Sequence, residues 1–165
     1  MIQKKICLLG ASSVGKTSLV KQFVEGIFNE KYLTSIGVKV DKKLVSVKEQ
    51  EVQLMIWDVE GYDRYNVFQD KYLRGAAAYI IVVDQSRKTS LLEGIDIHAL
   101  VRKVTKVPSI LAINKSDLHA DSLLDDEQIN QFLALFDRQF NTSAKTGNNV
   151  EALFQAIAEL TLKDD

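Results

Sequence analysis

The sequence predicts an α/β protein with a six-stranded, mostly parallel sheet that has one antiparallel edge strand and helices on both faces. Short apolar segments that suit strands alternate with segments whose apolar residues recur at helical spacing. The polar motifs of the chain come where strand-like segments end, which is where open α/β sheets bind ligands. With 165 residues, of which 46% are hydrophobic, residues 1–165 suit a single domain.

The first half of the chain predicts a strand, a helix and a β-hairpin. Residues 4–10 contain an apolar run shorter than the ~7 to 15 residues of a secretory signal, so they suit a buried strand. A helix is expected at residues 15–26. Two strands at residues 38–47 and 51–58 follow one another directly, which predicts an antiparallel hairpin at a sheet edge. A short helix is expected after Tyr62.

The second half of the chain alternates between strands and helices. Strands are expected at residues 77–84, 109–114 and 138–142, and helices at residues 90–103, 125–136 and 148–162. Ser90 and Glu93 form a capping-box pattern that predicts where the first of these helices begins. The longest apolar run, residues 76–83, is far shorter than the ~20 residues of a membrane span and suits a central parallel strand.

Charge and cysteine content disfavour several classes of protein. The formal net charge is −1 with both signs interspersed, so the chain has no electrostatic footprint for nucleic acid or anionic lipid. Cys7 is the only cysteine, which excludes an intrachain disulfide and fits a reducing compartment. We therefore expect a cytoplasmic monomer. No site for a lipid anchor is visible, so membrane association is expected only through a partner or if the chain is truncated.

Residues 10–17 read G-A-S-S-V-G-K-T directly after the first strand and fit the phosphate-binding loop pattern G-x-x-x-x-G-K-[ST]. Glycines let several backbone N–H groups point at one phosphate, and the next helix presents its positive end there. We expect Lys16 to neutralise the β- and γ-phosphates of a nucleoside triphosphate and Thr17 to offer its hydroxyl to Mg²⁺. The alternative is a glycine-containing turn that binds no ligand.

A second motif, D-V-E-G at residues 58–61, follows an apolar strand-like segment. Asp58 is placed at the strand tip, where its carboxylate can hold the Mg²⁺ shell. Gly61 can bring its backbone N–H to the γ-phosphate because no Cβ obstructs the approach. By itself the pattern also fits an ordinary turn, but its order and distance after the phosphate loop favour the metal and phosphate role.

Two further motifs predict guanine as the base. The N-K-S-D motif ends at Asp117, whose carboxylate can accept hydrogen bonds from N1–H and the exocyclic amino group of guanine. Adenine would leave this carboxylate unpaired, which costs ~1 to 3 kcal/mol or more. Lys115 can lay its aliphatic stem on the base, and Asn114 can tie this loop to the phosphate loop. The T-S-A-K motif at residues 142–145 ends the next strand, where the N–H of Ala144 can meet the guanine carbonyl.

Over nearly its whole length the chain resembles a small GTPase of the Ras superfamily, nearest the Rab branch. Besides the four motifs, the segments S-I-G-V at residues 35–38 and Y-L-R-G-A at residues 72–76 are similar to Rab segments. The resemblance implies the three-layer P-loop NTPase (small G protein) fold. It also implies that Phe28 packs against the guanine and Tyr32 lies over the phosphates, although both aromatic residues also suit local packing in a loop.

The resemblance further implies two switch regions and the partners that read them. Switch I lies around Ser35, and switch II runs from Gly61 to about Arg74. Effector, exchange and activating proteins are the implied partners. Contacts to GTP or GDP are expected from Ser12, Ser13, Val14, Gly15, Lys16, Thr17, Ser18, Phe28, Tyr32, Ser35, Gly61, Asn114, Lys115, Asp117, Ser143, Ala144 and Lys145. The expected Mg²⁺ ligands are Thr17, Ser35 and Asp58, and the positions assigned to hydrolysis are Lys16, Ser35, Gly61 and Tyr62.

Three departures from the usual family residues affect the expected activity. Ser35 replaces a threonine, and the missing methyl leaves switch I less restrained, so the GTP state is expected to be partly open. Tyr62 replaces the glutamine that orients the attacking water, and a phenol cannot both accept and donate as a carboxamide does. Hydrolysis should therefore be slow, with Glu60 as an alternative water-positioning group. Ser12 and Ser13 replace glycines and can crowd an arginine supplied by a partner.

Taken together, these patterns predict a switch that binds GTP or GDP with Mg²⁺ and slowly hydrolyses GTP to GDP and phosphate. The alternative is a GTP-binding scaffold with negligible intrinsic hydrolysis that recruits partners. An ATP-dependent phosphotransferase would share the phosphate loop, but the N-K-S-D motif and the absence of a substrate lid disfavour it.

Overall fold

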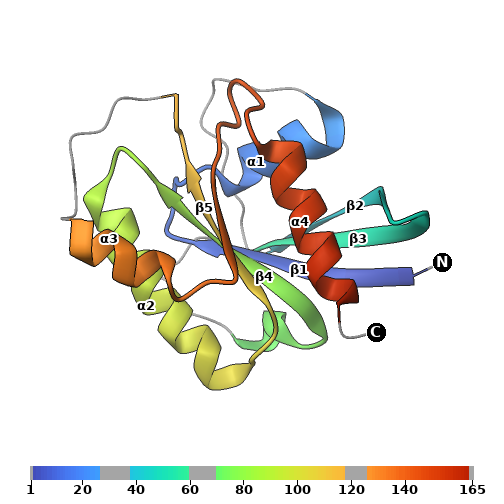
Figure 1. The fold of residues 1–165 in the computed structure, drawn as a ribbon, viewed down its shortest axis with the longest axis horizontal. Coiled ribbons are helices and arrows are strands. Elements are labelled where there is room, and N and C mark those ends of the chain that lie inside the picture. Colours follow the sequence, from blue (N-terminus) through green and yellow to red (C-terminus); the bar gives the residue numbers. More distant parts are fainter. Residues whose placement is uncertain (1, 27–37, 60–69, 118–125, 164–165) are drawn as a thin grey trace.

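The computed structural model describes residues 2–26, 38–59, 70–117 and 126–163. Within these ranges a six-stranded sheet has the order β2-β3-β1-β4-β5-β6, in which only the β2–β3 pair is antiparallel (Figure 1). The strands are β1 (Ile2–Gly10), β2 (Val38–Val47), β3 (Gln50–Val59), β4 (Ala76–Asp84), β5 (Ser109–Asn114) and β6 (Arg138–Asn141). The predicted sheet and its antiparallel hairpin are confirmed.

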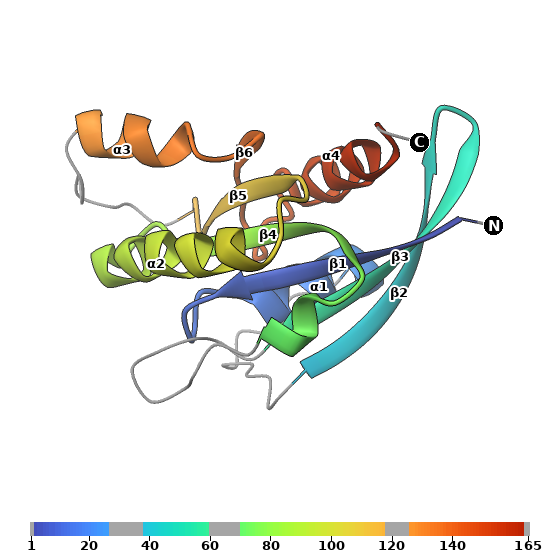
Figure 2. The ribbon, with the colours of Figure 1, turned by 90° about the horizontal axis from the view of Figure 1, so that it is seen from below.

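Helices cover both faces of the sheet, which completes the three-layer arrangement (Figure 2). The helices are α1 (Lys16–Glu25), α2 (Lys88–Val104), α3 (Asp126–Leu133) and α4 (Val150–Leu162), with a short 3₁₀ helix at Asp70–Leu73. Helices α1 and α4 pack on one face, where the rings of Phe23 and Phe154 stack with centroids 4.1 Å apart. Helices α2 and α3 pack on the other.

The side chains of β1 show how one strand serves two cores. Ile6 and Leu8 pack into the cluster under α1 and α4, whereas Cys7 and Leu9 pack into the cluster under α2. Because successive side chains on a strand point to opposite faces, a strand buried on both faces needs a continuous apolar run. The apolar run in β1, which resembles a short signal sequence, is therefore explained by its position inside the sheet.

Predicted and observed bounds agree closely for the strands and less well for two helices. Helix α2 begins at Lys88, and its N-cap is Arg87, so the capping box predicted from Ser90 and Glu93 is wrong. The Ser90 hydroxyl accepts from the backbone N–H of Asp84 over 2.9 Å and thereby fastens the helix to the end of β4. Helix α3 ends at Leu133, three residues earlier than predicted, and the chain continues in turns to Phe136, which remains buried.

The two ends of the sheet have different features (Figures 1 and 2). The carboxyl ends of the parallel strands meet at one end, next to the start of α1. The start of β1, the β2–β3 turn and the end of α4 lie at the other. Among the residues that the structure describes, no helix is long and apolar enough to cross a membrane.

His98, one of two histidines in the chain, packs in the core between α2 and the sheet. It is 4% exposed, its Nδ1 lies 3.0 Å from the Tyr79 hydroxyl, and its ring lies against that of Phe136. Burial lowers the pKa of His98 from 6.5 to about 4, with a further lowering from the charge of Arg102 and a smaller opposing effect of Asp137. The ring is therefore neutral at pH 7.

Acidification is expected to destabilise the fold through His98. The pKa of the folded ring lies below that of the unfolded chain, so the unfolded chain binds more protons between about pH 4 and 6.5, and stability falls as the pH drops through this window. Between pH 7 and 5.5 we expect the wild type to lose about 1 kcal/mol more unfolding free energy than His98→Gln. Urea titrations of both proteins at the two pH values measure this difference. Equal losses of unfolding free energy in the two proteins would contradict the assignment of this pH dependence to His98.

Candidate nucleotide site

The phosphate loop connects β1 to α1 in the backbone conformation that its glycines permit. Gly15 has φ 97° and directly precedes the first residue of α1, and a Cβ at this position would collide with the side-chain amide of Asn114. A Cβ at Gly10 would collide with the backbone carbonyl of Val82 on the neighbouring strand. Both glycines are therefore required by close approach as well as by backbone angle, because other residues rarely adopt positive φ.

Lys16 is buried at the centre of this loop. It is 6% exposed, and its ammonium group donates to the carbonyl oxygens of Ala11 over 3.0 Å and Gly10 over 3.4 Å. Burial lowers the pKa of Lys16 from 10.5 to about 8, an effect that the carboxylate of Asp58 opposes and the charge of Arg87 reinforces. Among the described residues, the hydrogen-bond acceptors of Lys16 are these two neutral carbonyls, which compensate a buried cation less well than an anion does, so an anion placed beside it is stabilised.

The two described residues that the sequence assigns to Mg²⁺ lie side by side. The Thr17 hydroxyl donates to Oδ2 of Asp58 over 2.6 Å, although the two residues come from α1 and β3. Asp58 is fully buried at the carboxyl end of its strand. A hydroxyl and a carboxylate are the hard oxygen donors that Mg²⁺ prefers, so this pair fits the predicted ion.

The two base motifs meet at the ends of β5 and β6. Asn114 is buried and donates to the carbonyl of Val14 over 2.9 Å, so it ties this loop to the phosphate loop as predicted. Its Oδ1 accepts from the Thr142 hydroxyl over 3.1 Å. Ser143 donates to the Asp117 carboxylate over 2.8 Å and orients it. The structure therefore joins the phosphate loop and both base motifs into one site.

Of the other residues of the base motifs, Lys115 and Ala144 contact neighbouring elements and Lys145 faces solvent. Lys115 lies with its ammonium group 3.0 Å from the carbonyl oxygen of Ser13. The carbonyl of Ala144 accepts from the side chain of Gln22 over 2.7 Å, which fastens this loop to α1. Lys145 is exposed to solvent. Phe28, Tyr32, Ser35, Glu60, Gly61 and Tyr62 lie outside the described residues, so the predictions made for them stay predictions.

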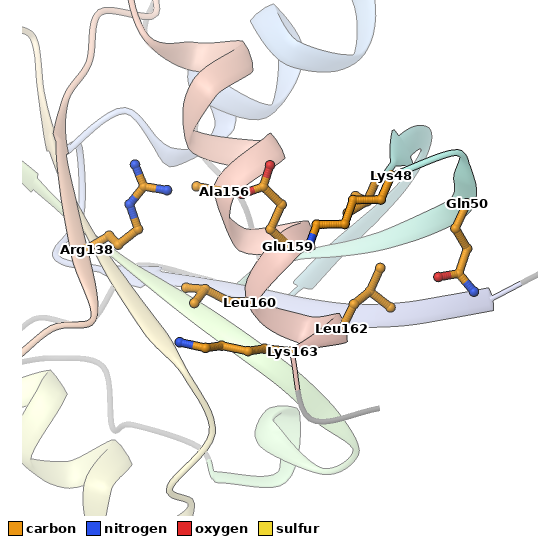
Figure 3. A pocket seen from close by; sticks show the side chains of 9 residues that line it. Lys48, Gln50, Arg138, Ala156, Glu159, Leu160, Leu162 and Lys163 are labelled. Carbon is orange, nitrogen blue, oxygen red and sulfur yellow. The ribbon is translucent and has the colours of Figure 1, made fainter.

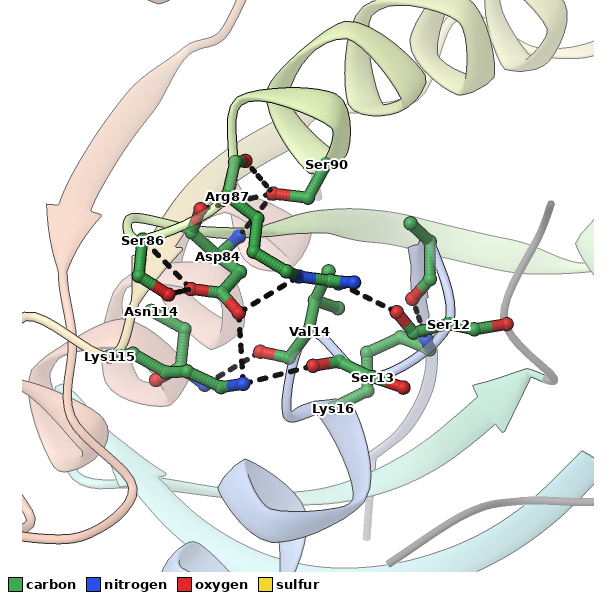
Figure 4. A network of polar contacts seen from close by, with 11 residues as sticks. Ser12, Ser13, Val14, Lys16, Asp84, Ser86, Arg87, Ser90, Asn114 and Lys115 are labelled. Atoms are coloured by element: carbon green, nitrogen blue, oxygen red, sulfur yellow. Dashed lines mark hydrogen bonds and ion pairs between the residues drawn. The ribbon is translucent and has the colours of Figure 1, made fainter. Parts of the chain in front are cut away.

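Asp84 is a buried residue of this site that the sequence motifs did not identify (Figure 4). Its Oδ2 lies 2.9 Å from Nζ of Lys115 and 3.2 Å from Nε of Arg87, and its Oδ1 accepts from the backbone and hydroxyl of Ser86. Burial raises the pKa of Asp84, but the bonds from Ser86 and Lys115 outweigh burial and lower it. The available signal was an aspartate that ends an apolar run, as Asp58 does.

A separate pocket of about 460 Å³ lies at the opposite end of the sheet, between α4, β6 and the β2–β3 turn (Figure 3). Its polar lining includes Lys48, Arg138 and Lys163 together with the carboxylate of Glu159. Leu160 contributes apolar surface. None of its lining residues belongs to the phosphate loop or the base motifs, so this pocket is distinct from the candidate nucleotide site.

Fold and site together define an α/β nucleotide-binding protein with a phosphate loop at the point where the strand order reverses. Comparison with models of protein families matches residues 5–163 to the Ras family. The match covers almost the whole chain, so the protein belongs to the Ras family. Members of this family are GTP-binding small GTPases that act as switches, and the protein belongs to that class.

Proposed function

We propose that this protein is a Rab-like, guanine-nucleotide-dependent switch that binds GTP and GDP with Mg²⁺ and hydrolyses GTP slowly. The observation that carries the proposal is the bond from Asn114 to Val14, which joins the base motif to the phosphate loop. The pairing of Ser143 with Asp117 supports guanine as the base, since it holds a carboxylate that matches two guanine donors.

In this proposal each side chain has a defined task in holding the nucleotide. Lys16 neutralises the β- and γ-phosphates, and the backbone N–H groups of the loop donate to the same oxygens. Thr17, Ser35 and Asp58 hold Mg²⁺, which spreads the negative charge of the triphosphate when bound. The reaction then needs positioning and charge stabilisation rather than a covalent intermediate.

Slow hydrolysis is expected because switch II has a tyrosine in place of the glutamine that orients the attacking water. Tyr62 lacks the carboxamide that both accepts from water and donates to the transferring phosphoryl group. Gly61 and Ser35 bond the γ-phosphate in the GTP state, and loss of that phosphate changes the two switches and hence the affinity for effectors. We propose a cytoplasmic monomer that depends on exchange and activating proteins.

The test combines nucleotide identification with single-turnover hydrolysis. Protein purified in Mg²⁺ should release GDP or GTP on denaturation, and its loaded GTP should turn over slowly. Tyr62→Gln is expected to raise the hydrolysis rate at least about tenfold, since positioned proton acceptors and donors contribute factors of this order or more. Tyr62→Phe is the matched control and should leave the slow rate unchanged.

The outcomes separate the proposal from its alternatives. A wild-type rate as fast as that of ordinary family members, unaffected in Tyr62→Phe, would contradict the account of switch II. No hydrolysis in any variant, even with cell extract, would favour a GTP-binding scaffold. Displacement of a fluorescent GDP analogue by ATP as readily as by GTP would contradict guanine specificity.

A further inference from the structure

Three successive carbonyl oxygens of the phosphate loop are each held by a side chain from outside the loop (Figure 4). The donors come from the segments that follow β4 and β5 or from the last residue of β5. The pairs are Arg87 Nη2 to Ser12 O at 2.8 Å, Lys115 Nζ to Ser13 O at 3.0 Å, and Asn114 Nδ2 to Val14 O at 2.9 Å.

Because a peptide unit is planar, a bond that holds the carbonyl oxygen of one residue also fixes the direction of the N–H group of the next residue. In a trans peptide the carbonyl of one residue and the N–H of the next point in opposite directions, and the described part of the chain has no cis peptide. Carbonyls held toward β4 and β5 therefore direct the N–H groups of Ser13, Val14 and Gly15 away from them. Successive N–H groups that converge on one side form an anion-binding concavity.

The loop needs this external support because part of its backbone is strained. Ser13 has φ 68°, a left-handed conformation that is unfavourable for a residue with a Cβ. Such a conformation persists where surrounding contacts determine it. The peptides on both sides of Ser13 have their carbonyls held, one by Arg87 and the other by Lys115.

Arg87 differs from the other two donors because it belongs to none of the nucleotide motifs. Asp84 fixes one edge of its guanidinium through Nε, which leaves Nη2 aimed at Ser12. A planar guanidinium can make both bonds at once, whereas an ammonium group is a single point charge without this fixed fork. The positive charge of Arg87 also reaches Lys16, since it helps to lower the pKa of that residue.

We propose that Arg87, anchored by Asp84, is a positioning residue that turns the Ser12–Ser13 peptide so that its N–H faces the phosphates of a bound guanine nucleotide. The proposal rests on the proposed function. It predicts a larger effect on GDP than on GMP, because the proposed function assigns the N–H groups of the phosphate loop to the β- and γ-phosphates and the guanine contacts to Asp117, which lies on a different loop.

The experiment measures GDP and GMP affinities of the full chain by calorimetry. Arg87→Met should weaken GDP binding roughly tenfold, the loss expected for one bond to a charged group, and GMP binding less than twofold. Arg87→Lys keeps the charge but not the fork, so it should resemble Arg87→Met. Lys88→Met removes the neighbouring exposed charge and is the matched control, for which no change is expected.

Each outcome decides the question. Wild-type GDP affinity in Arg87→Lys together with weakened binding in Arg87→Met would show that charge alone matters and would overturn the positioning role. Equal weakening of GDP and GMP would assign Arg87 to the stability of the site as a whole and would also overturn it. Failure of the proposed function is distinguishable, since the wild-type protein would then bind neither nucleotide.

Discussion

Replacing Lys16 with methionine is expected to weaken GDP and GTP binding by roughly a thousandfold, the cost of leaving buried anionic groups without their cation. Lys16 is 6% exposed, and within the described part of the chain its ammonium group donates to the loop carbonyls of Gly10 and Ala11. Phosphate oxygens are better partners for a desolvated ammonium group than neutral carbonyls are. Methionine keeps most of the volume, so the loss reports charge rather than a cavity.

The matched control for this change is Lys21→Met on the same helix. Lys21 pairs with Glu25 at 3.9 Å on the surface of α1, and its side chain is 31% exposed. Removal of this charge should leave nucleotide affinity within about twofold, since exposed ion pairs contribute little. Equilibrium titration with a fluorescent GDP analogue measures both variants. Affinity within tenfold of the wild type in Lys16→Met would contradict the central role of Lys16.

The sequence predicted the fold because each element is consistent with its place in the sheet. Residues 76–83 form a continuous apolar run, and β4 is buried on both faces, as such a run predicts for a central parallel strand. The β2–β3 hairpin was predicted from two adjacent strand-like segments, and β2, at the sheet edge, alternates between more and less exposed residues. In both elements the hydrophobic pattern of the strand matches its position in the sheet.

The sequence could not predict contacts that depend on which strand ends are neighbours. Serine is a residue type that often caps helices. The hydroxyl of Ser90 instead bonds the end of β4, because the helix begins two residues before it. Arg87 and Asp84 are close in sequence, but their effect appears only once β4 is placed beside β1 and the phosphate loop. By contrast, the bond from Asn114 to the phosphate loop was predictable, since a motif already specified its partner.

Removing the carboxylate of Asp117 is expected to abolish the preference for guanine over hypoxanthine. Inosine triphosphate lacks the exocyclic amino group of GTP but keeps N1–H, so the two ligands differ by one bond to a charged acceptor. Such a bond contributes about 1.5 to 3 kcal/mol, and the wild type should therefore prefer GTP by roughly 10- to 100-fold. In Asp117→Ala both ligands should bind weakly and with nearly equal affinity.

Ser143 and Asp96 provide the comparisons that make this result specific. Ser143 holds the Asp117 carboxylate through a 2.8 Å bond, so Ser143→Ala should reduce the preference for GTP without removing it. Asp96 is an exposed carboxylate on α2, and Asp96→Ala should leave both affinities unchanged. Competition titrations with GTP and inosine triphosphate give the ratio of the two affinities for the wild type and for each of the three variants. A preference for GTP that persists in Asp117→Ala would mean that another group reads the amino group, and the guanine site would have to be assigned to different residues.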